Sequence, residues 1–383
     1  MIDPTTKPRP RLLLSANSAW NIANFRLGLA KALEGAGFEV TVAAPADGHE
    51  GRLREAGIGF LPLWMNRSGM NPIADLQLMG RYSAILRDLR PAAYLGFTIK
   101  PNIYGSLAAR AHGVRAINNV SGLGTMFLSY GWQSTLARAL YRLAFARSQT
   151  VFFQNPEDRQ QFISTGTVQP TQAKLLPGSG IDLNRFTPTP LPAGSPVFLF
   201  IGRLLADKGV REFVAAAEIV RKAMPDARFQ ILGGSDPGNR TCIPALEIDR
   251  WRASGIVELL GEVGDVRPHI QAASAIVLPS YREGLPRVLL EGGAMGRPLI
   301  ASDVPGCRTI VAAGKNGLLF DVRNARALAN VLLEFAGLSN DQRQEMGRAA
   351  RALVERDYDE QRVINAYLAS LVDIAPVSGV GAA

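Results

Sequence analysis

The chain has 383 residues, a mass of 41.2 kDa and a net charge of +9, with 47% hydrophobic and 20% charged residues. This length predicts two domains or three small ones, and the composition is that of a packed protein, which excludes a disordered scaffold and a lone binding module. No apolar run reaches the length of a membrane-spanning helix, and the polar residues 1–10 do not resemble a signal peptide. We therefore expect a cytoplasmic protein.

Metal-binding side chains are few in this sequence. The cysteines are Cys242 and Cys307, and the histidines are His49, His112 and His269. These residues are too widely spaced to supply a zinc site or a disulfide framework. We expect neither a metal nor another cofactor.

The positive charge is concentrated in the first half of the chain. Residues 1–180 hold 19 Lys and Arg against 10 Asp and Glu, whereas residues 181–383 hold 23 of each kind. Between Arg81 and Arg147 the only acid is Asp88. This asymmetry favours an anionic partner for the first half, although an ordinary solvated surface is the simpler alternative.

The first half alternates between strand and helix patterns. The apolar run at residues 12–14 is followed by a polar loop, a helical pattern over residues 25–33 and a β-branched run at residues 40–42. This order predicts a βαβ unit and hence a parallel sheet. Further buried strands are predicted at residues 58–63, 92–96, 116–118 and 150–153.

A Pro-, Thr- and Gly-rich stretch at residues 187–196 is the predicted linker between two domains. Beyond it, strands are predicted at residues 197–201, 229–232, 257–260, 275–278, 299–301 and 317–320. The alternation predicts an α/β protein with two facing Rossmann-like domains, at residues 1–186 and 197–355, that bind ligands at the carboxyl ends of parallel sheets. We expect a helix within residues 356–375 to return to the first domain, and residues 376–383 to form a disordered tail.

The strongest chemical signal is a pair of acids that follows an apolar strand. Glu283 and Glu291 are separated by seven residues in the segment YREGLPRVLLEGG. Pro286 suits the first turn of a helix, so we expect a helix from near Leu285, with Glu283 on the preceding loop and Glu291 in the second turn. Two solvated acids are the alternative, but the nearby glycines allow a ligand to approach the backbone closely.

Two cations follow another predicted strand. In the segment IGRLLADKGV, Arg203 and Lys208 are placed to clamp a diphosphate. The amides of Arg287 and Val288, at the start of the predicted helix, form a second anion site. The turn at Gly233, after a third strand, is expected to close the nucleotide side.

These motifs, together with GSGIDLNRF at residues 178–186, resemble glycosyltransferase family 4, whose members are retaining, metal-independent enzymes of the GT-B fold. The stretches NIANFRLGLAKAL, WMNRSGMNP, TIKPNIYGSLAAR, NVSGLGT and ILGGSDPGNRTC are similar to bacterial enzymes that extend polyprenyl-diphosphate-linked oligosaccharides, especially N-acetylgalactosaminyltransferases. The resemblance implies transfer of a hexose or N-acetylhexosamine from a UDP-sugar to a lipid-linked saccharide in glycan or lipopolysaccharide assembly. A GDP-sugar donor or a soluble acceptor remains an alternative.

The resemblance also implies roles for single residues. Glu291 would bind the ribose, Arg203 and Lys208 the departing diphosphate, and Glu283 the hydroxyls of the donor sugar. The other implied donor contacts are Gly233, Glu262, Val263, Gly284, Leu285, Pro286 and Arg287.

One segment departs from the family pattern. Many members carry a histidine near the reacting sugar, where this chain reads NNVSGLG at residues 118–124. Asn17, Ser18 and Lys100 become candidates for contacts on that side of the sugar. An ordinary loop role is equally compatible with each of the three.

An acceptor held in a membrane requires a way to dock there. Phe127, Tyr130 and Trp132 belong to an apolar, glycine-bounded segment, and the helix predicted at residues 134–147 follows it. Aromatic side chains beside basic ones are typical of interfacial anchors. We therefore predict peripheral binding to the anionic inner face of the cytoplasmic membrane.

The predicted helix at residues 134–147 combines charged and apolar side chains. Arg138 and Arg142 are its candidates for contact with lipid headgroups. Its leucines, Leu136, Leu140 and Leu143, are expected on the core side.

Other functions fit the sequence less well. A retaining glycosidase needs two carboxyls about 5 Å apart across the scissile bond, which a loop acid and a helix acid do not favour. The acids Asp357 and Asp359 have the spacing of a metal-dependent transferase but lie in a helical region, where capping is the better interpretation. No complete GxGxxG supports a dehydrogenase, and the aromatic residues lack the arrangement of a nucleic-acid-binding protein.

Overall fold

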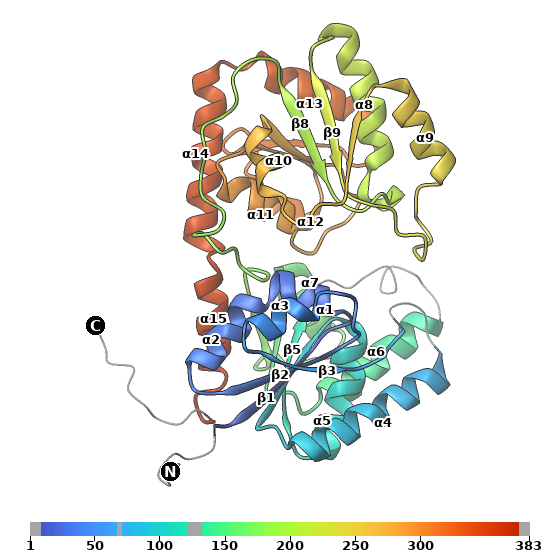
Figure 1. Cartoon of the computed structure of the whole chain (residues 1–383), viewed down its shortest axis with the longest axis vertical. Helices are drawn as coiled ribbons and strands as arrows, with labels where there is room; N and C mark the ends of the chain where they lie inside the picture. The colour runs from blue at the N-terminus through green and yellow to red at the C-terminus, as the bar shows by residue number, and fades with distance from the viewer. Residues whose placement is uncertain (1–8, 67–70, 122–131, 375–383) are drawn as a thin grey trace, which may run out of the picture. The chain divides into compact units, whose positions relative to one another are not determined.

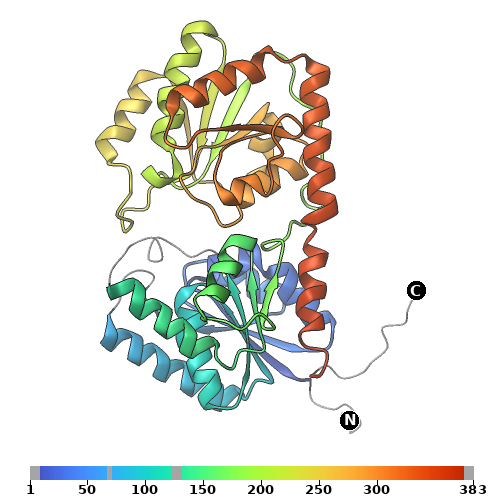
Figure 2. The same cartoon turned by 180° about the vertical axis from the view of Figure 1, so that it is seen from behind.

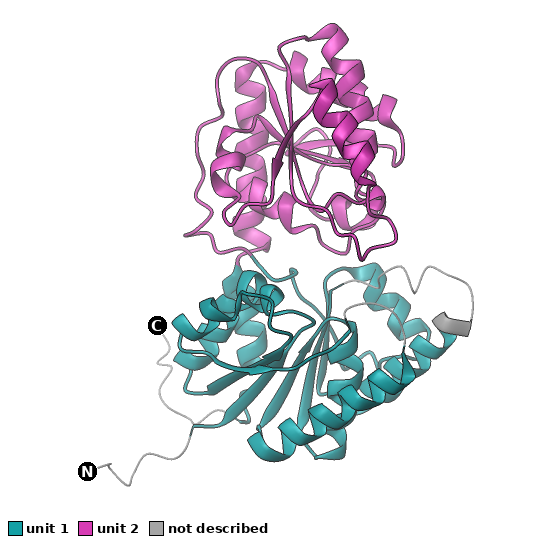
Figure 3. Ribbon diagram, turned by 45° about the vertical axis from the view of Figure 1, so that its right-hand side comes forward, with its two compact units in different colours: residues 1–180, 360–383 teal, residues 181–359 magenta. Residues whose placement is uncertain are grey.

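The computed structural model describes residues 9–66, 71–121 and 132–374. The chain forms two compact units (Figure 3): unit 1 comprises residues 1–180 and 360–383, and unit 2 comprises residues 181–359. Every strand pair in both sheets is parallel. The predicted α/β class with two parallel-sheet domains is confirmed.

The sheet of unit 1, of which Figure 1 labels β1, β2, β3 and β5, has the strand order β3-β2-β1-β4-β5-β6-β7. Its strands are β1 (Arg11–Ser15), β2 (Glu39–Ala44), β3 (Gly59–Pro62), β4 (Ala93–Phe97), β5 (Arg115–Val120), β6 (Thr150–Phe153) and β7 (Ala173–Leu175). The order reverses between β1 and β4, which makes this point the topological switch of the sheet. The sequence missed β7, because this edge strand has three residues and buries only Ala173.

Helices cover both faces of the sheet of unit 1. The first face carries α1 (Ala19–Phe25), α2 (Leu27–Gly35), α3 (Glu50–Glu55) and α15 (Glu360–Ala369). The second face carries α4 (Pro72–Leu89), the π-helix η1 (Pro101–Gly105), α5 (Ser106–Ala111), α6 (Trp132–Phe145) and α7 (Pro156–Ser164). Because side chains alternate along a strand, Leu12 and Leu14 pack against the first layer, whereas Leu13 packs against the second.

The helix α15 belongs to unit 1, although residues 181–359 separate it from the rest of that unit. Its buried side chains Val363, Ile364 and Tyr367 join the core that contains β1 and α2. The Tyr367 hydroxyl also accepts a hydrogen bond from the amide of Asn119 at 3.2 Å. The last helix therefore ties the end of the chain to the first sheet.

The sheet of unit 2 has the order β10-β9-β8-β11-β12-β13. Its strands are β8 (Val197–Ile201), β9 (Arg228–Leu232), β10 (Glu258–Gly261), β11 (Ala275–Leu278), β12 (Leu299–Ser302) and β13 (Gly317–Phe320). All six were predicted from short apolar runs to within one residue at each end. Here the switch point lies between β8 and β11.

Two helical layers enclose the sheet of unit 2. One contains α8 (Val210–Ala223), α9 (Ala245–Ser254) and α13 (Ala325–Gly337). The other contains α10 (Arg267–Ala272), α11 (Arg287–Ala294), α12 (Pro305–Arg308) and α14 (Asn340–Asp357). A capping box of Ser339 and Gln342 begins α14, which ends at Asp357.

The chain passes from unit 1 to unit 2 at residues 180 and 181, earlier than the linker predicted at residues 187–196. That stretch is instead held on unit 2 by Arg297, which is fully buried. The Arg297 guanidinium donates to the carbonyls of Thr189 at 2.7 Å and Pro190 at 3.0 Å. Burial lowers the pKa of Arg297 to about 10. The segment whose composition resembled a flexible linker is thus held on unit 2 by hydrogen bonds.

Candidate functional site

The switch point of unit 2 brings two predicted loops together. β8 and β11 are neighbours in the sheet, but the helices that follow them, α8 and α11, pack on opposite faces. Loops that diverge in this way mark the usual ligand position of a parallel α/β sheet. The segments with Lys208 and Glu283 follow these two strands.

The two loops are in direct contact at the edge of the sheet. The amide of Tyr281 donates to the carbonyl of Asp207 at 2.9 Å. Gly209 has a φ of +71°, and a Cβ there would lie 2.0 Å from the carbonyl oxygen of Pro279. Because only glycine fits this position, Gly209 sets the distance between the loops.

An ion pair bridges the switch point. The Nζ of Lys208 lies 2.6 Å from Oε1 of Glu283, and the two side chains are 26% and 13% exposed. Lys208 ends the short 3₁₀ helix at Ala206–Lys208, and Glu283 lies on the loop after β11, as predicted. Two residues predicted to bind parts of one donor therefore bind each other in this structure.

The second acid, Glu291, lies in α11, the helix that follows the Glu283 loop. α11 begins at Arg287, and Pro286 is its N-cap, so the predicted start near Leu285 is two residues early. Pro286 has an extended ψ of 107° and disfavours a helical conformation at the residue before it. Glu291 is in the second turn, where it accepts a hydrogen bond from Nε of Arg287 at 2.8 Å. Burial raises the pKa of Glu291, although Arg287 opposes this shift.

The loop after β12 closes the site from another side. Gly306, in α12, lies so near the Glu283 loop that a Cβ would approach the carbonyl oxygens of Glu283 and Gly284 to 2.4 and 2.7 Å. A larger residue would push this loop away from Lys208. Gly306 thus allows close approach between two loops of the protein.

The loops after β9 and β10 lie at the same edge of the sheet as the loop after β8. Gly233 has a φ of +150°, and its Cα faces the carbonyl of Gly202 so closely that a Cβ would lie 1.9 Å from that oxygen. The carboxylate of Glu262 lies over Gly234, and Val263 is 39% exposed. The loops after β8, β9 and β10 therefore line one edge of the sheet.

Arg203 lies in the first of these loops, but its nearest charge is Asp236. Nη1 of Arg203 is 2.6 Å from Oδ2 of Asp236, and the two side chains are 56% and 35% exposed. The guanidinium is therefore held at the surface by a carboxylate, unlike the more buried Lys208. An incoming diphosphate competes with Asp236 for this cation.

Sequence reasoning missed a support of the Glu283 loop. The hydroxyl of Tyr281 donates to Oε1 of Glu212 on α8 at 2.6 Å, and the guanidinium of Arg323 lies 4.6 Å from the centre of the Tyr281 ring. These contacts fasten the loop to two other elements. Tyr281 stands two residues before Glu283, but nothing in the sequence identifies its partners.

A neutral hydrogen bond joins the two loops at the switch point of unit 1, and one of its residues is strained. The backbone amide of Asn17, after β1, donates to the hydroxyl of Thr98, after β4, at 3.1 Å. Thr98 has a φ of +67°, which is rare for a β-branched residue. Ser18 is buried and caps α1 by accepting from the amide of Asn21 at 3.1 Å. Thr98 was not identified from the sequence, which carries no signal of backbone strain at a threonine.

Lys100 is engaged inside unit 1. Its Nζ lies 2.7 Å from Oδ1 of Asp75 on α4, and both side chains are largely buried. The Tyr104 hydroxyl donates to the other Asp75 oxygen at 3.0 Å. The Lys100 charge thus has a partner on α4, within unit 1.

The segment that departs from the family pattern begins inside the core. Asn118 and Asn119 are fully buried. The Asn118 amide donates to the hydroxyl of Ser106 at 2.7 Å, and its carbonyl oxygen accepts from Ser148 at 2.7 Å. These two asparagines link β5 to neighbouring elements.

The predicted membrane segment is only partly described. Phe127 and Tyr130 lie outside the described residues, as does the side chain of Trp132 at the start of α6. Arg138 is half-buried. The guanidinium of Arg142 donates to the carbonyls that follow α7, those of Thr165 at 2.7 Å and Gly166 at 3.0 Å. Arg142 therefore also has a structural role.

The expectation for the leucines of α6 was wrong at two positions. Leu136 is 43% exposed and Leu143 is 51% exposed, whereas Leu140 is partly buried. The core side is formed by Ala137, Tyr141, Ala144 and Phe145, which pack around β6 and Phe162. Because this aromatic cluster turns the helix, Leu136 and Leu143 point outward.

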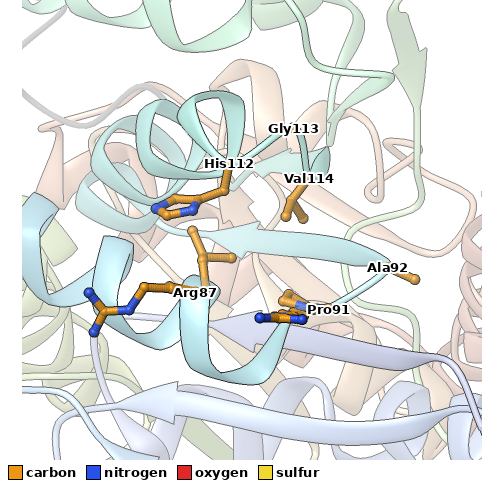
Figure 4. A pocket seen from close by; sticks show the side chains of 8 residues that line it. Arg87, Pro91, Ala92, His112, Gly113 and Val114 are labelled. Carbon is orange, nitrogen blue, oxygen red and sulfur yellow. The ribbon is translucent and has the colours of Figure 1, made fainter.

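A pocket of unit 1 lies away from both switch points. Figure 4 shows a pocket between the ends of α4 and α5, with Arg87, His112 and Val114 among its lining residues. It lies before β4 and β5, at the edge opposite to the strand ends described above. Within the described ranges no three His, Cys, Asp or Glu side chains are grouped to hold a metal ion. None of the described helices is long and apolar enough to cross a membrane.

Comparison with known families matches both units. The family described as glycosyl transferase 4-like domain matches residues 22–178, and the family described as glycosyl transferases group 1 matches residues 195–337. Together the two matches cover more than half of the chain. The matched ranges contain the strands at both switch points, except β1.

Two curated relatives are similar over large parts of the chain. The N,N'-diacetylbacillosaminyl-diphospho-undecaprenol α-1,3-N-acetylgalactosaminyltransferase of Campylobacter jejuni is 28% identical over 94% of this chain and 97% of its own length. The UDP-Gal:α-D-GlcNAc-diphosphoundecaprenol α-1,3-galactosyltransferase of Escherichia coli is 27% identical over 61% of this chain and 63% of its own.

Solved structures share the fold. HepE of Anabaena, solved with UDP-glucose, superposes with a TM-score of 0.79 over 95% of this chain and 99% of its own, at 18% identity. The sucrose-phosphate synthase of Thermosynechococcus elongatus gives a TM-score of 0.77 over 95% of this chain and 98% of its own, at 20% identity.

Proposed function

We propose a donor and an acceptor for this chain, which belongs to the group 1 glycosyltransferases and carries a glycosyl transferase 4-like domain in its first half. In this proposal it transfers a hexose or N-acetylhexosamine from a UDP-sugar to a saccharide carried on a polyprenyl diphosphate. The names of both curated relatives support the acceptor class, and that of the Escherichia coli relative supports a UDP-linked donor.

The observation that carries the proposal is the Lys208–Glu283 ion pair at the switch point of unit 2. A diphosphate would replace Glu283 as the partner of Lys208, because it carries more charge and can also accept hydrogen bonds from the first turn of α11. Glu283 would then be released to bind the hydroxyls of the donor sugar. Donor binding thus exchanges one set of charge-assisted bonds for another.

Glu291 would accept hydrogen bonds from the ribose, on the same helix whose first turn meets the phosphate. Its carboxyl is already desolvated, so the cost of burying it is not incurred again when the nucleotide binds. Arg287 would hold the carboxylate in place through the 2.8 Å hydrogen bond. Glu262 and Val263 would lie near the base, beside Gly233.

The proposed reaction retains the configuration of the donor sugar. The acceptor hydroxyl oxygen bonds to the anomeric carbon on the face from which UDP departs, while the bond from that carbon to the phosphate oxygen breaks. A donor phosphate oxygen takes the hydroxyl proton. Lys208, Arg203 and the amides of α11 would stabilise the charge that grows on the departing diphosphate, a contribution of about 3 kcal/mol for each well-placed donor. These cations make a metal ion unnecessary in the proposal.

A membrane-held acceptor would bring unit 1 to an anionic surface. The helices α4, α5 and α6 lie side by side on one face of its sheet (Figure 2). The outward side of α6 exposes Leu136 and Leu143, and Arg110 lies beside it, with its guanidinium 3.3 Å from the carbonyl of Leu143. Apolar side chains beside cations suit the interface of an anionic bilayer. We propose that this face binds the inner leaflet.

The test of the donor class is a thermal-shift and donor-hydrolysis screen across UDP- and GDP-sugars, which requires no acceptor. UDP and at least one UDP-sugar should raise the melting temperature, because they bind only the folded protein. Stabilisation by GDP-sugars alone would instead support the alternative donor. Stabilisation by none of these ligands would contradict the proposed function.

A further inference from the structure

An exposed tryptophan lies beside the switch point of unit 1. Trp20 is the second residue of α1, directly after the loop with Asn17 and Ser18, and it is 44% exposed. It therefore stands at the carboxyl edge of the sheet, where ligands of parallel α/β sheets bind. The residues that the proposed function assigns to the donor come from unit 2, whereas the resemblance made Asn17 and Ser18 of unit 1 candidates for the donor sugar.

The backbone of Trp20 is held by hydrogen bonds, and its indole contacts one aromatic ring. Its backbone amide donates to both carboxylate oxygens of Asp47, at 3.1 and 3.2 Å, and its carbonyl accepts from the side-chain amide of Asn24 at 3.0 Å. The ring of Phe25 meets the indole nearly edge-on, at 5.0 Å between centroids and 83° between planes. The Phe25 contact restricts the indole and thereby lowers the side-chain entropy lost when a ligand stacks on it.

The loop before Trp20 is held in place by a strained residue. The left-handed Thr98 accepts the Asn17 amide across the switch point. The side chain of Asn17 is half-buried and has no hydrogen-bond partner within the described ranges. A carboxamide in this state can both donate to and accept from a ligand hydroxyl. Strained residues of this kind often persist where they shape a binding site.

The charges around Trp20 differ from those of the α6 face. Asp47 accepts from the Trp20 amide, and Glu50 in turn accepts from the amides of Asp47 and Gly48. Backbone hydrogen bonds lower the pKa of Glu50, so it remains a carboxylate. Arg52 donates to Asn24 at 2.8 Å and supplies one opposing charge. This mixed environment does not favour an anionic bilayer, but carboxylate and amide groups suit a neutral ligand with many hydroxyls.

We propose that Trp20 and Asn17 form a binding site for the saccharide of the acceptor. The indole would stack on the apolar face of a sugar ring, and Asn17 and Asp47 would bind its hydroxyls. This inference rests on the proposed function, because it assumes a saccharide acceptor. It assigns Asn17 to the acceptor instead of the donor sugar, and it does not depend on the Lys208 site.

The probe is a water-soluble GlcNAc diphosphate ester of a short-chain alcohol, observed through the indole N–H resonances of the protein. Replacing Trp20 by Phe identifies its resonance as the one that disappears. The matched control is Trp64, which is 59% exposed in the same unit but has the guanidinium of Arg81 at 5.4 Å from its ring centre. We expect the probe to shift the Trp20 resonance and leave that of Trp64 in place.

Kinetics give a second readout. Trp20→Ala should raise KM for the probe about tenfold, since a lost stacking contact is worth roughly one factor of ten in affinity, whereas Trp20→Phe should restore most of it. Trp64→Ala should leave this KM unchanged, and hydrolysis of the UDP-sugar should be the same in all three variants. A Trp20 resonance that does not move with the probe, or a KM unchanged in Trp20→Ala, would overturn the proposal. In that event, intact binding of UDP-sugars would leave the proposed donor site standing.

Discussion

The two units have the same kind of sheet but opposite chemistry at their switch points. In unit 2 a half-buried ion pair, Lys208 with Glu283, joins the loops after the central strands. In unit 1 the corresponding loops are joined by a neutral hydrogen bond from Asn17 to Thr98. A charged switch point suits an anionic group, whereas a neutral one beside an exposed indole suits hydroxyls and an apolar ring face. The parallel sheet therefore determines where a ligand binds, and the loop residues determine which chemistry it has.

The largest effect is expected at the charged switch point. Lys208→Ala should lower kcat by about 100- to 1000-fold, because it removes a cation from the departing diphosphate. The measurement is transfer from a UDP-sugar, with the melting temperature recorded to show that the variant folds. Lys222→Ala, which removes an exposed lysine from α8, is the matched control and should retain full activity. Full activity of Lys208→Ala would show that the charge at the switch point of unit 2 is not needed for transfer.

The next effect concerns Glu291. Glu291→Ala should weaken binding of UDP by about 2 to 3 kcal/mol, since it removes charge-assisted hydrogen bonds to the ribose. Titration calorimetry measures this loss directly. Unchanged affinity in a folded variant would place the ribose elsewhere.

The same carboxyl predicts a pH dependence. Burial raises the pKa of Glu291 above 4.5, so on acidification its carboxylate is protonated at a higher pH than that of an exposed glutamate. The contribution of this group to folded stability is present at low pH and is lost as the pH rises through the raised pKa. Uridine, which has no phosphate to titrate, should bind less tightly as pH falls through this window. Glu291→Gln should bind uridine weakly but without that pH dependence, and an identical profile in both proteins would contradict the assignment.

Much of the fold was predictable because the strands are short apolar runs separated by helical patterns. The strands β8 and β11 match their predicted ranges, and the three-residue β7 was missed because it carries too few buried side chains to form a pattern. The exposure of Leu136 and Leu143 was not predictable, because α6 has alanines and aromatics that compete for the core side. Amphipathic patterns are ambiguous where small residues occur on both sides.

The site was predictable as a set of residues but not as a set of contacts. Lys208 and Glu283 were each placed after a strand, yet 75 positions separate them, and no sequence pattern specifies their pairing. The partners of Lys100 and Arg142 were not predictable either, because they too are distant in the sequence. Strain at Thr98 arises from backbone geometry, which periodicity does not report.

The surface of unit 1 offers a smaller test. Replacing Leu136 and Leu143 together by Asp should weaken binding to anionic vesicles at least about tenfold, because it removes apolar area that would enter the interface. The control is Leu246→Asp on α9 of unit 2, where a leucine is 64% exposed. These variants replace a charge reversal at Arg142, which would also disturb the end of α7. An affinity for anionic vesicles that is unchanged by the Leu136 and Leu143 substitutions would exclude α6 as the docking surface.

A modest effect is expected at the neutral switch point. Thr98→Ala loses the bond to Asn17 and keeps the left-handed strain, whereas Thr98→Gly loses the bond but relieves the strain. Thr98→Gly should therefore be more stable than Thr98→Ala by about 1 kcal/mol in urea unfolding. Equal free energies of unfolding of the two variants would show that the strain at Thr98 does not lower the stability of the protein.

No effect is expected from removing metal ions. Transfer should survive EDTA, because Lys208, Arg203 and the first turn of α11 are proposed to neutralise the diphosphate. Loss of activity with EDTA, restored by Mg²⁺ or Mn²⁺, would direct attention back to Asp357 and Asp359. Both acids lie where α14 gives way to α15.

The most direct test of the central claim is calorimetric titration of Lys208→Ala with UDP and with uridine. If the charged switch point of unit 2 binds the diphosphate, the variant should lose affinity for UDP by about tenfold or more and bind uridine as the unaltered protein does. Equal losses for both ligands, or no loss for UDP, would contradict the account.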